Sequence, residues 1–101
     1  MSELRDKRAL FTKLICRLVN EMIFKGYTPC FGKEGLKHMD GSLHYEGLAK
    51  DIDLYKGDQY LDKTEDHAEF GKIWESYNPL CRWGGRFKDG NHYAIEYQGK
   101  K

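Results

Sequence analysis

The first 25 residues carry the longest regular pattern of the chain, so they constrain the fold most. Ser2 precedes acidic residues, which is typical of a helix N-terminus, and Gly26 is placed to end the helix. Apolar residues recur at intervals of three and four, as on one face of an α-helix; they are Leu4, Phe11, Leu14, Ile15, Leu18, Met22 and Ile23. The pattern predicts an amphipathic helix over residues 2–25 that packs on a core, with Cys16 inside its apolar stripe.

An alternating pattern over residues 48–54 predicts a β-strand. Successive side chains of a strand point to opposite faces, so the two leucines and the isoleucine of this stretch face the core. Asp51 then points to the other face, toward a cleft, and Asp53 lies two residues along on the same side.

The remaining segments predict shorter elements. Residues 30–41 are polar and rich in glycine, which indicates a loop, while residues 65–76 predict a second helix. The last strand is expected over residues 92–97. His38 in the loop and His67 on the second helix are expected to be solvated. We therefore expect one α+β domain over residues 1–101, with a small antiparallel sheet flanked by helices and a cleft on one sheet face.

The composition excludes several classes of function. Lysine and arginine number 17 against 16 acidic residues, and this balance argues against nucleic-acid binding. The chain has no long apolar run, so no membrane insertion is expected. A charged N-terminus without an apolar segment predicts synthesis in the cytoplasm without a signal peptide. Three cysteines without Cys-x-x-Cys spacing agree with a reducing compartment.

Two short motifs contain the residues best suited to chemistry. The first runs from Ser42 to Asp51 and includes His44, and the second contains Asp89 and His92. Together they supply two imidazoles, one carboxylate that can ligate, from Asp51, and one further carboxylate three residues before the last histidine, from Asp89. A catalytic zinc site needs three such ligands, an open position for water and a nearby acid or base. The inventory indicates hydrolysis assisted by a metal ion.

The motif Ser-x-His-x-x-Gly-x-Ala-x-Asp, followed by Asp-x-x-His, resembles the signature of the zinc D,D-carboxypeptidases and L-alanoyl-D-glutamate endopeptidases. Their superfamily includes lysostaphin-type enzymes and the hedgehog signalling domain. Within it, the chain is most similar to the small cell-wall peptidases of bacteriophages, the endolysins. The likeness runs from about residue 36 to residue 97. It implies a hedgehog/D-Ala-D-Ala peptidase-like fold with a zinc cleft on one sheet face.

On this basis we expect His44, Asp51 and His92 to bind Zn²⁺ and Asp89 to act as general base. Asp89 would take a proton from the attacking water and deliver it to the departing amine. Asp53 is the alternative ligand, or a partner that supports the ligands. The alternative for Asp89 is a role in forming the turn.

A substrate groove is expected beside the metal, because glycine lets a peptide backbone approach closely. Its expected lining is Ser42, Tyr45, Trp83, Gly84 and Gly85. Core packing is an equal alternative for Trp83, and a turn or support role is the alternative for Ser42.

Two positions differ from the family pattern. Relatives carry an arginine ahead of the first motif, whereas this chain has no arginine between Arg17 and Arg82. Lys33, Lys37, Arg82 and Arg86 are the candidate substitutes. A glutamate often found two residues after the last histidine is replaced by Ala94.

The resemblance implies hydrolysis of an amide bond in peptidoglycan stem peptides by a phage lysis enzyme. The bond is that of an L-alanoyl-D-glutamate endopeptidase or of a D,D-carboxypeptidase. We expect a monomer that reaches the cell wall by another route, such as a phage-encoded pore. One alternative is a catalytically weak or inactive module that keeps zinc for stability and binds the cell wall or signals. The other is a virion structural protein without metal.

Overall fold

The computed structural model describes residues 2–32, 43 and 46–101, and the statements below concern those residues. The protein is an α+β domain with a small open antiparallel sheet and two α-helices, as the sequence predicted. The elements follow the order α1 (Glu3–Phe24), β1 (Thr28–Phe31), β2 (Ala49–Lys56), β3 (Gln59–Tyr60), the 3₁₀ helix η1 (Thr64–His67), α2 (Ala68–Tyr77), β4 (Cys81–Trp83), the 3₁₀ helix η2 (Gly84–Phe87) and β5 (His92–Ile95).

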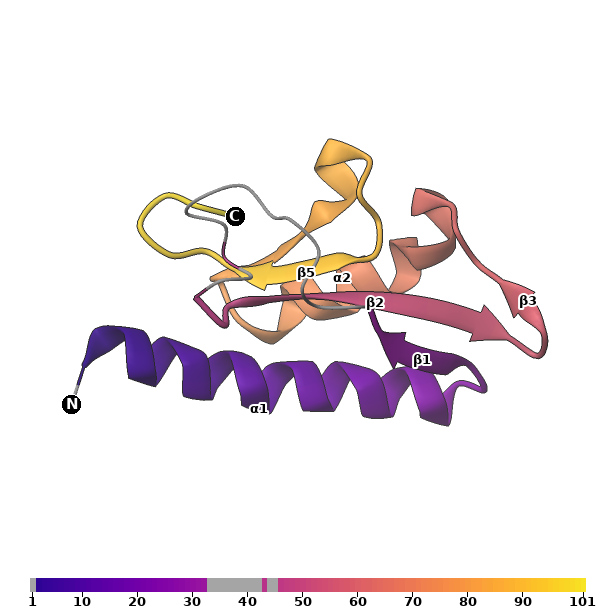
Figure 1. Ribbon diagram of the computed structural model, residues 1–101, viewed down its shortest axis with the longest axis horizontal. Helices are drawn as coiled ribbons and strands as arrows, with labels where there is room; N and C mark the ends of the chain where they lie inside the picture. The colour runs from indigo at the N-terminus through magenta and orange to yellow at the C-terminus, as the bar shows by residue number, and fades with distance from the viewer. Residues whose placement is uncertain (1, 33–42, 44–45) are drawn as a thin grey trace.

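The sheet is organised around β2, its longest strand. The strand order is β1-β2-β5-β4, and β3 forms a short hairpin with the end of β2. All of these pairings are antiparallel. Figure 1 shows β2 crossing the middle of the molecule beside β5, with α1 lying along its length. One half of β2 pairs with β1 and the other half with β5, so β2 connects the two parts of the sheet.

The helices supply much of the apolar core. The sheet contributes Leu48, which directly precedes β2, and Ile52 and Leu54 within β2. All three side chains are fully buried, which confirms the inward face predicted for this stretch. Trp74 of α2 is also fully buried, and its indole N–H donates to the carbonyls of Arg82 and Ala94 at 3.1 and 3.0 Å. Because these carbonyls belong to β4 and β5, the indole joins α2 to both strands without leaving a buried donor unpaired.

Helix α1 matches the predicted helix closely. Ser2 is its N-cap, with Oγ accepting from the Arg5 N–H at 3.1 Å, and Gly26 follows its end with φ +93°. The buried positions are Phe11, Leu14, Ile15, Leu18 and Met22. Cys16 and Ile23 are exposed, so their predicted packing was wrong. Each lies one residue after a buried position. Because one residue turns a helix by about 100°, its side chain points away from the core. Among the residues described, no helix is both long enough and apolar enough to cross a membrane.

Strands β1 and β4 differ from the predictions. β1 includes Cys30 and Phe31, which were assigned to the loop, and β4 was not predicted. Neither strand forms a tight hairpin with its partner, because residues 32–48 separate β1 from β2 and residues 84–91 separate β4 from β5, so short-range patterns do not reveal these pairings. The second helix begins as η1 and becomes α-helical only at Ala68, and the last strand ends at Ile95 rather than at residue 97.

His67 is buried, with 2% of its surface exposed, so the prediction of a solvated side chain was wrong. Its Nδ1 lies 2.8 Å from the Tyr93 hydroxyl, and a further hydrogen bond joins the ring to the Leu61 backbone. Burial lowers the pKa of His67 and outweighs the opposite effects of Asp66 and Asp53. Burial also raises the pKa of Tyr93, and the buried hydroxyl and the imidazole serve as hydrogen-bond partners for each other.

Candidate metal site

The pairing of β2 with β5 places two predicted ligands opposite each other. Asp51 is the register partner of His92, and directly opposed side chains lie on the same face of a sheet. His92 Nδ1 lies 3.5 Å from Asp51 Oδ1, with side-chain exposures of 15% and 33% respectively. Strand register therefore joins the first motif to the second.

Asp89 reaches the same place through the turn that precedes β5. Its N–H donates to the Gly84 carbonyl at 3.0 Å, and its own carbonyl accepts from the His92 N–H at 3.1 Å. One carboxylate oxygen each from Asp51 and Asp89 and one ring nitrogen of His92 all lie within 4.8 Å of one another. Asp89 is exposed, whereas the other two residues are partly buried. These three residues form a possible metal-binding group.

The donor set suits a divalent transition metal. Imidazole and carboxylate are both zinc ligands, whereas magnesium and calcium favour oxygen donors alone. Two ligand atoms bound tetrahedrally at about 2.1 Å are roughly 3.4 Å apart. The 3.5 Å between His92 Nδ1 and Asp51 Oδ1 is close to that separation.

The other predicted site residues have different outcomes. His44, Ser42 and Tyr45 lie outside the described residues, so their predicted roles stay predictions. Asp53 is not part of the metal-binding group. Its Oδ1 accepts from the Asn91 amide at 3.3 Å and lies 3.5 Å from the Tyr60 hydroxyl. This contact fits the alternative of a supporting partner, because Asn91 directly precedes His92.

Trp83 and the two glycines after it are closely packed. A Cβ added at Gly71 or Gly85 would lie 2.2 or 2.3 Å from the Trp83 ring, so only glycine fits against the indole at these two positions. Gly84 is buried, and a Cβ there would lie 2.3 Å from the Asp89 carbonyl oxygen. Internal packing accounts for the Trp-Gly-Gly sequence, and contact with a substrate stays a prediction.

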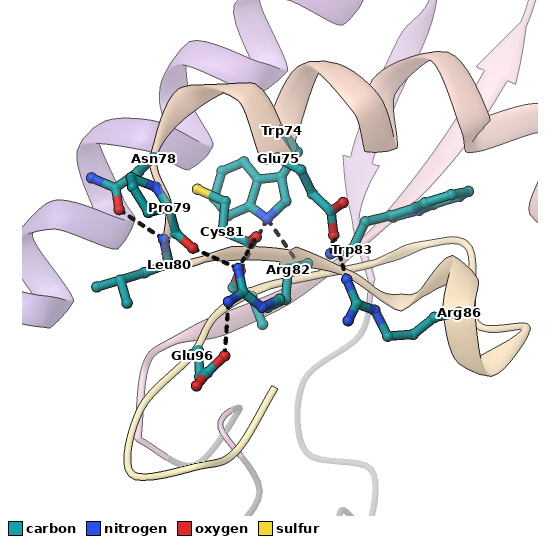
Figure 2. A network of polar contacts seen from close by, with 11 residues as sticks. Trp74, Glu75, Asn78, Pro79, Leu80, Cys81, Arg82, Trp83, Arg86 and Glu96 are labelled. Atoms are coloured by element: carbon teal, nitrogen blue, oxygen red, sulfur yellow. Dashed lines mark hydrogen bonds and ion pairs between the residues drawn. The ribbon is translucent and has the colours of Figure 1, made fainter.

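The arginines considered as substitutes make contacts within the protein (Figure 2). Arg82 forms an ion pair with Glu96 at 3.0 Å and donates to the carbonyls of Pro79 and Cys81 at 2.6 and 2.9 Å. Arg86 forms an ion pair with Glu75 at 3.0 Å. Glu75 also accepts from the Trp83 N–H at 2.8 Å. Both guanidinium groups therefore stabilise the region around β4, and Lys33 and Lys37 lie outside the described residues.

A polar cavity of about 130 Å³ adjoins Asp89. Its walls come from the β3 region, η1 and the turn before β5, and they include Tyr60, Thr64, Lys88, Asp89 and Asn91. Asp89, the expected general base, thus belongs both to the metal-binding group and to the wall of a cavity with polar lining. Sequence patterns did not indicate this cavity, because its walls come from three separate segments.

Comparisons with known proteins identify no relative of this chain. No family model, curated protein or solved structure matches it. The family resemblance carried by the two motifs therefore remains an expectation.

Proposed function

We propose that this protein is a zinc metallopeptidase that hydrolyses an amide bond in peptidoglycan stem peptides. In this proposal it belongs with the D,D-carboxypeptidases and L-alanoyl-D-glutamate endopeptidases and acts in phage lysis, with their hedgehog-like fold and a zinc cleft. The observation that supports it best is the approach of Asp51, Asp89 and His92 to within 4.8 Å. The resemblance implied two ligands and a base from these residues, and their side-chain atoms lie together.

The residues that would hold the ion are His44, Asp51 and His92. Bound zinc is a Lewis acid that polarises a carbonyl group and makes water more acidic. Asp51 and His92 project from paired strands, which restrict their movement because both backbones are hydrogen-bonded. Ligands on rigid elements keep a metal site in its productive geometry.

Asp89 would act as the general base. The turn fixes its backbone at both the N–H and the carbonyl, so its exposed carboxylate stays beside the two ligands. The carboxylate accepts a proton from the attacking water as the new C–O bond forms. It returns that proton to the amine nitrogen as the C–N bond breaks, so no net proton is gained or lost by the protein.

The decisive experiment measures zinc content together with release of amino groups from peptidoglycan. We expect one zinc per chain and an activity that a chelator removes. His92→Ala should lose the metal, whereas Asp89→Asn should keep it and lose activity by about 10²–10⁴-fold. Asp58→Asn, at an exposed aspartate between β2 and β3, is the matched control and should behave as the wild type.

The outcomes separate the roles of Asp89. Full activity of Asp89→Asn would refute the general-base role, and loss of zinc in that variant would make Asp89 a ligand. The products identify the bond, since a carboxypeptidase releases free D-alanine and the endopeptidase exposes a new amino group on D-glutamate. A preparation without zinc and without activity would refute the peptidase proposal and favour a metal-free structural protein.

The position of Asp89 also supports a second candidate, a zinc-stabilised module that binds the cell wall without turnover. A carboxylate within 4.8 Å of the Asp51 and His92 ligand atoms is close enough to complete a ligand set. In that arrangement it would not be available as a base. One zinc per chain, bound wall fragments and no release of amino groups would favour this candidate.

A further inference from the structure

The indole of Trp83 makes a hydrogen bond to the turn that carries Asp89. Its Nε1–H donates to the Gly90 carbonyl at 2.7 Å. Gly90 is buried between Asp89 and the residues that lead into β5. The bond therefore acts on the middle of the 89–92 turn, which we define as the residues from Asp89 to His92.

The indole is itself held from several sides. Gly71 of α2 and Gly85 of η2 lie against its ring so closely that a Cβ on either would overlap it. The Trp83 N–H donates to Glu75 at 2.8 Å, and the residue pairs with Tyr93 in the sheet. A side chain fixed by helix, strand and 3₁₀ turn in this way is a rigid donor for the Gly90 carbonyl.

Other contacts hold the 89–92 turn on its remaining sides. A Cβ on Gly90 would lie 2.6 Å from Thr64 Cα, so the turn packs directly on the start of η1. The Asn91 carbonyl accepts from the Ile52 N–H at 2.8 Å, which joins the turn to β2 beside Asp51. The turn is thus confined by β2, η1 and Trp83, and a small movement of it would change the distances among the three metal-binding residues.

We infer that Trp83 is a positioning residue that holds the 89–92 turn so that Asp89 and His92 stay beside Asp51. The part of this inference that concerns catalysis rests on the proposed function, whereas the positioning of the turn does not. Trp83 acts through Gly90 and does not itself supply a metal ligand. Partners that orient the ligands of a metal site typically contribute about 10–100-fold to metal affinity or activity.

The test compares Trp83→Phe with Trp74→Phe. Each variant keeps an aromatic ring and loses one indole donor, but the Trp74 donor serves the carbonyls of Arg82 and Ala94 rather than the turn. In metal-free protein, Trp83→Phe should selectively speed hydrogen exchange of the Asp89 and His92 amides. Trp74→Phe should speed exchange across the domain together, including these amides. Zinc affinity should fall about tenfold or more in Trp83→Phe beyond any loss in Trp74→Phe.

A wild-type measurement covers the case in which Trp83→Phe does not fold. Zinc titration should shift the indole N–H resonance of Trp83 more than that of Trp74, because only the former bonds to the turn. Unchanged exchange in a folded Trp83→Phe variant would overturn the inference, as would, in a wild type shown to bind zinc, an indole resonance that the bound zinc leaves in place. Because exchange is measured without metal or substrate, an inactive protein would count against the proposed function and leave this inference standing.

Discussion

Substitution of Gly84 by alanine should disrupt the candidate metal site by displacing the backbone that carries Asp89 and His92. Gly84 is the first residue of η2 and is buried. An alanine Cβ there would lie 2.3 Å from the Asp89 carbonyl oxygen and 2.8 Å from His92 Cβ. The first distance is about an ångström short of an ordinary contact, and the opposing atom is backbone, so the 89–92 turn has to move.

The cost follows from this overlap. Forcing one extra carbon into a packed region typically destabilises a protein by about 1–3 kcal/mol. In a domain of this size, each kcal/mol lowers Tm by roughly 4–8 °C. Because the two displaced residues belong to the metal-binding group, zinc affinity should fall in addition by about tenfold or more, equivalent to about 1.4 kcal/mol.

Gly57→Ala is the matched control. Gly57 has φ +59° and no atom within 4 Å of an added Cβ, so alanine there strains the backbone without any overlap. Its left-handed conformation should cost about 1–2 kcal/mol, which brings the two variants to similar stability. Calorimetry of unfolding and of zinc binding would compare them. If Gly84→Ala bound zinc as tightly as Gly57→Ala, the close approach at Gly84 would not be what positions the site.

Two further predictions concern the core. Since the folded-state pKa of His67 lies below the 6.5 of a free side chain, the unfolded chain takes up more protons in acid. The resulting stabilisation is complete above about pH 6.5 and is lost as pH falls from there toward the folded-state pKa. With chelator present, the free energy of unfolding of the wild type should therefore fall faster on acidification than that of His67→Gln, by at most about 1.4 kcal/mol per pH unit. Parallel plots of unfolding free energy against pH for the two proteins would show that His67 binds no additional proton on unfolding. Leu18→Ala, at a fully buried position of α1, should cost about 2–5 kcal/mol in urea unfolding. Ile23→Ala, at the exposed position of the same helix, should change stability by roughly 0.5 kcal/mol or less, and equal costs would contradict the burial difference between the two sites.

Helix α1 and the inward face of β2 were predictable because the relevant signal is local. A helix buries every third or fourth residue and a strand every second one, so each period appears in a short stretch of sequence. Cys16 and Ile23 show the limit of this argument, since the edge of an apolar stripe depends on how far the sheet extends beside the helix. The prediction of a solvated His67 failed for a related reason: its partner, the Tyr93 hydroxyl, lies in a distant strand.

The residue types of the candidate site and the spacing within each motif can be read directly from the amino-acid sequence. It could not determine that Asp51 and His92 would be register partners, because pairing between distant strands depends on the whole sheet. Nor did it decide between the two roles expected for Trp83, which were lining a substrate groove and packing in the core. The packing of Gly71 and Gly85 against the Trp83 ring, the hydrogen bond from its indole N–H to Gly90 and the approach of the Asp89 carbonyl to Gly84 all join segments that folding brings together. The physical reason is that side-chain chemistry is carried by each residue alone, whereas close approach is a property of segments that meet only after folding.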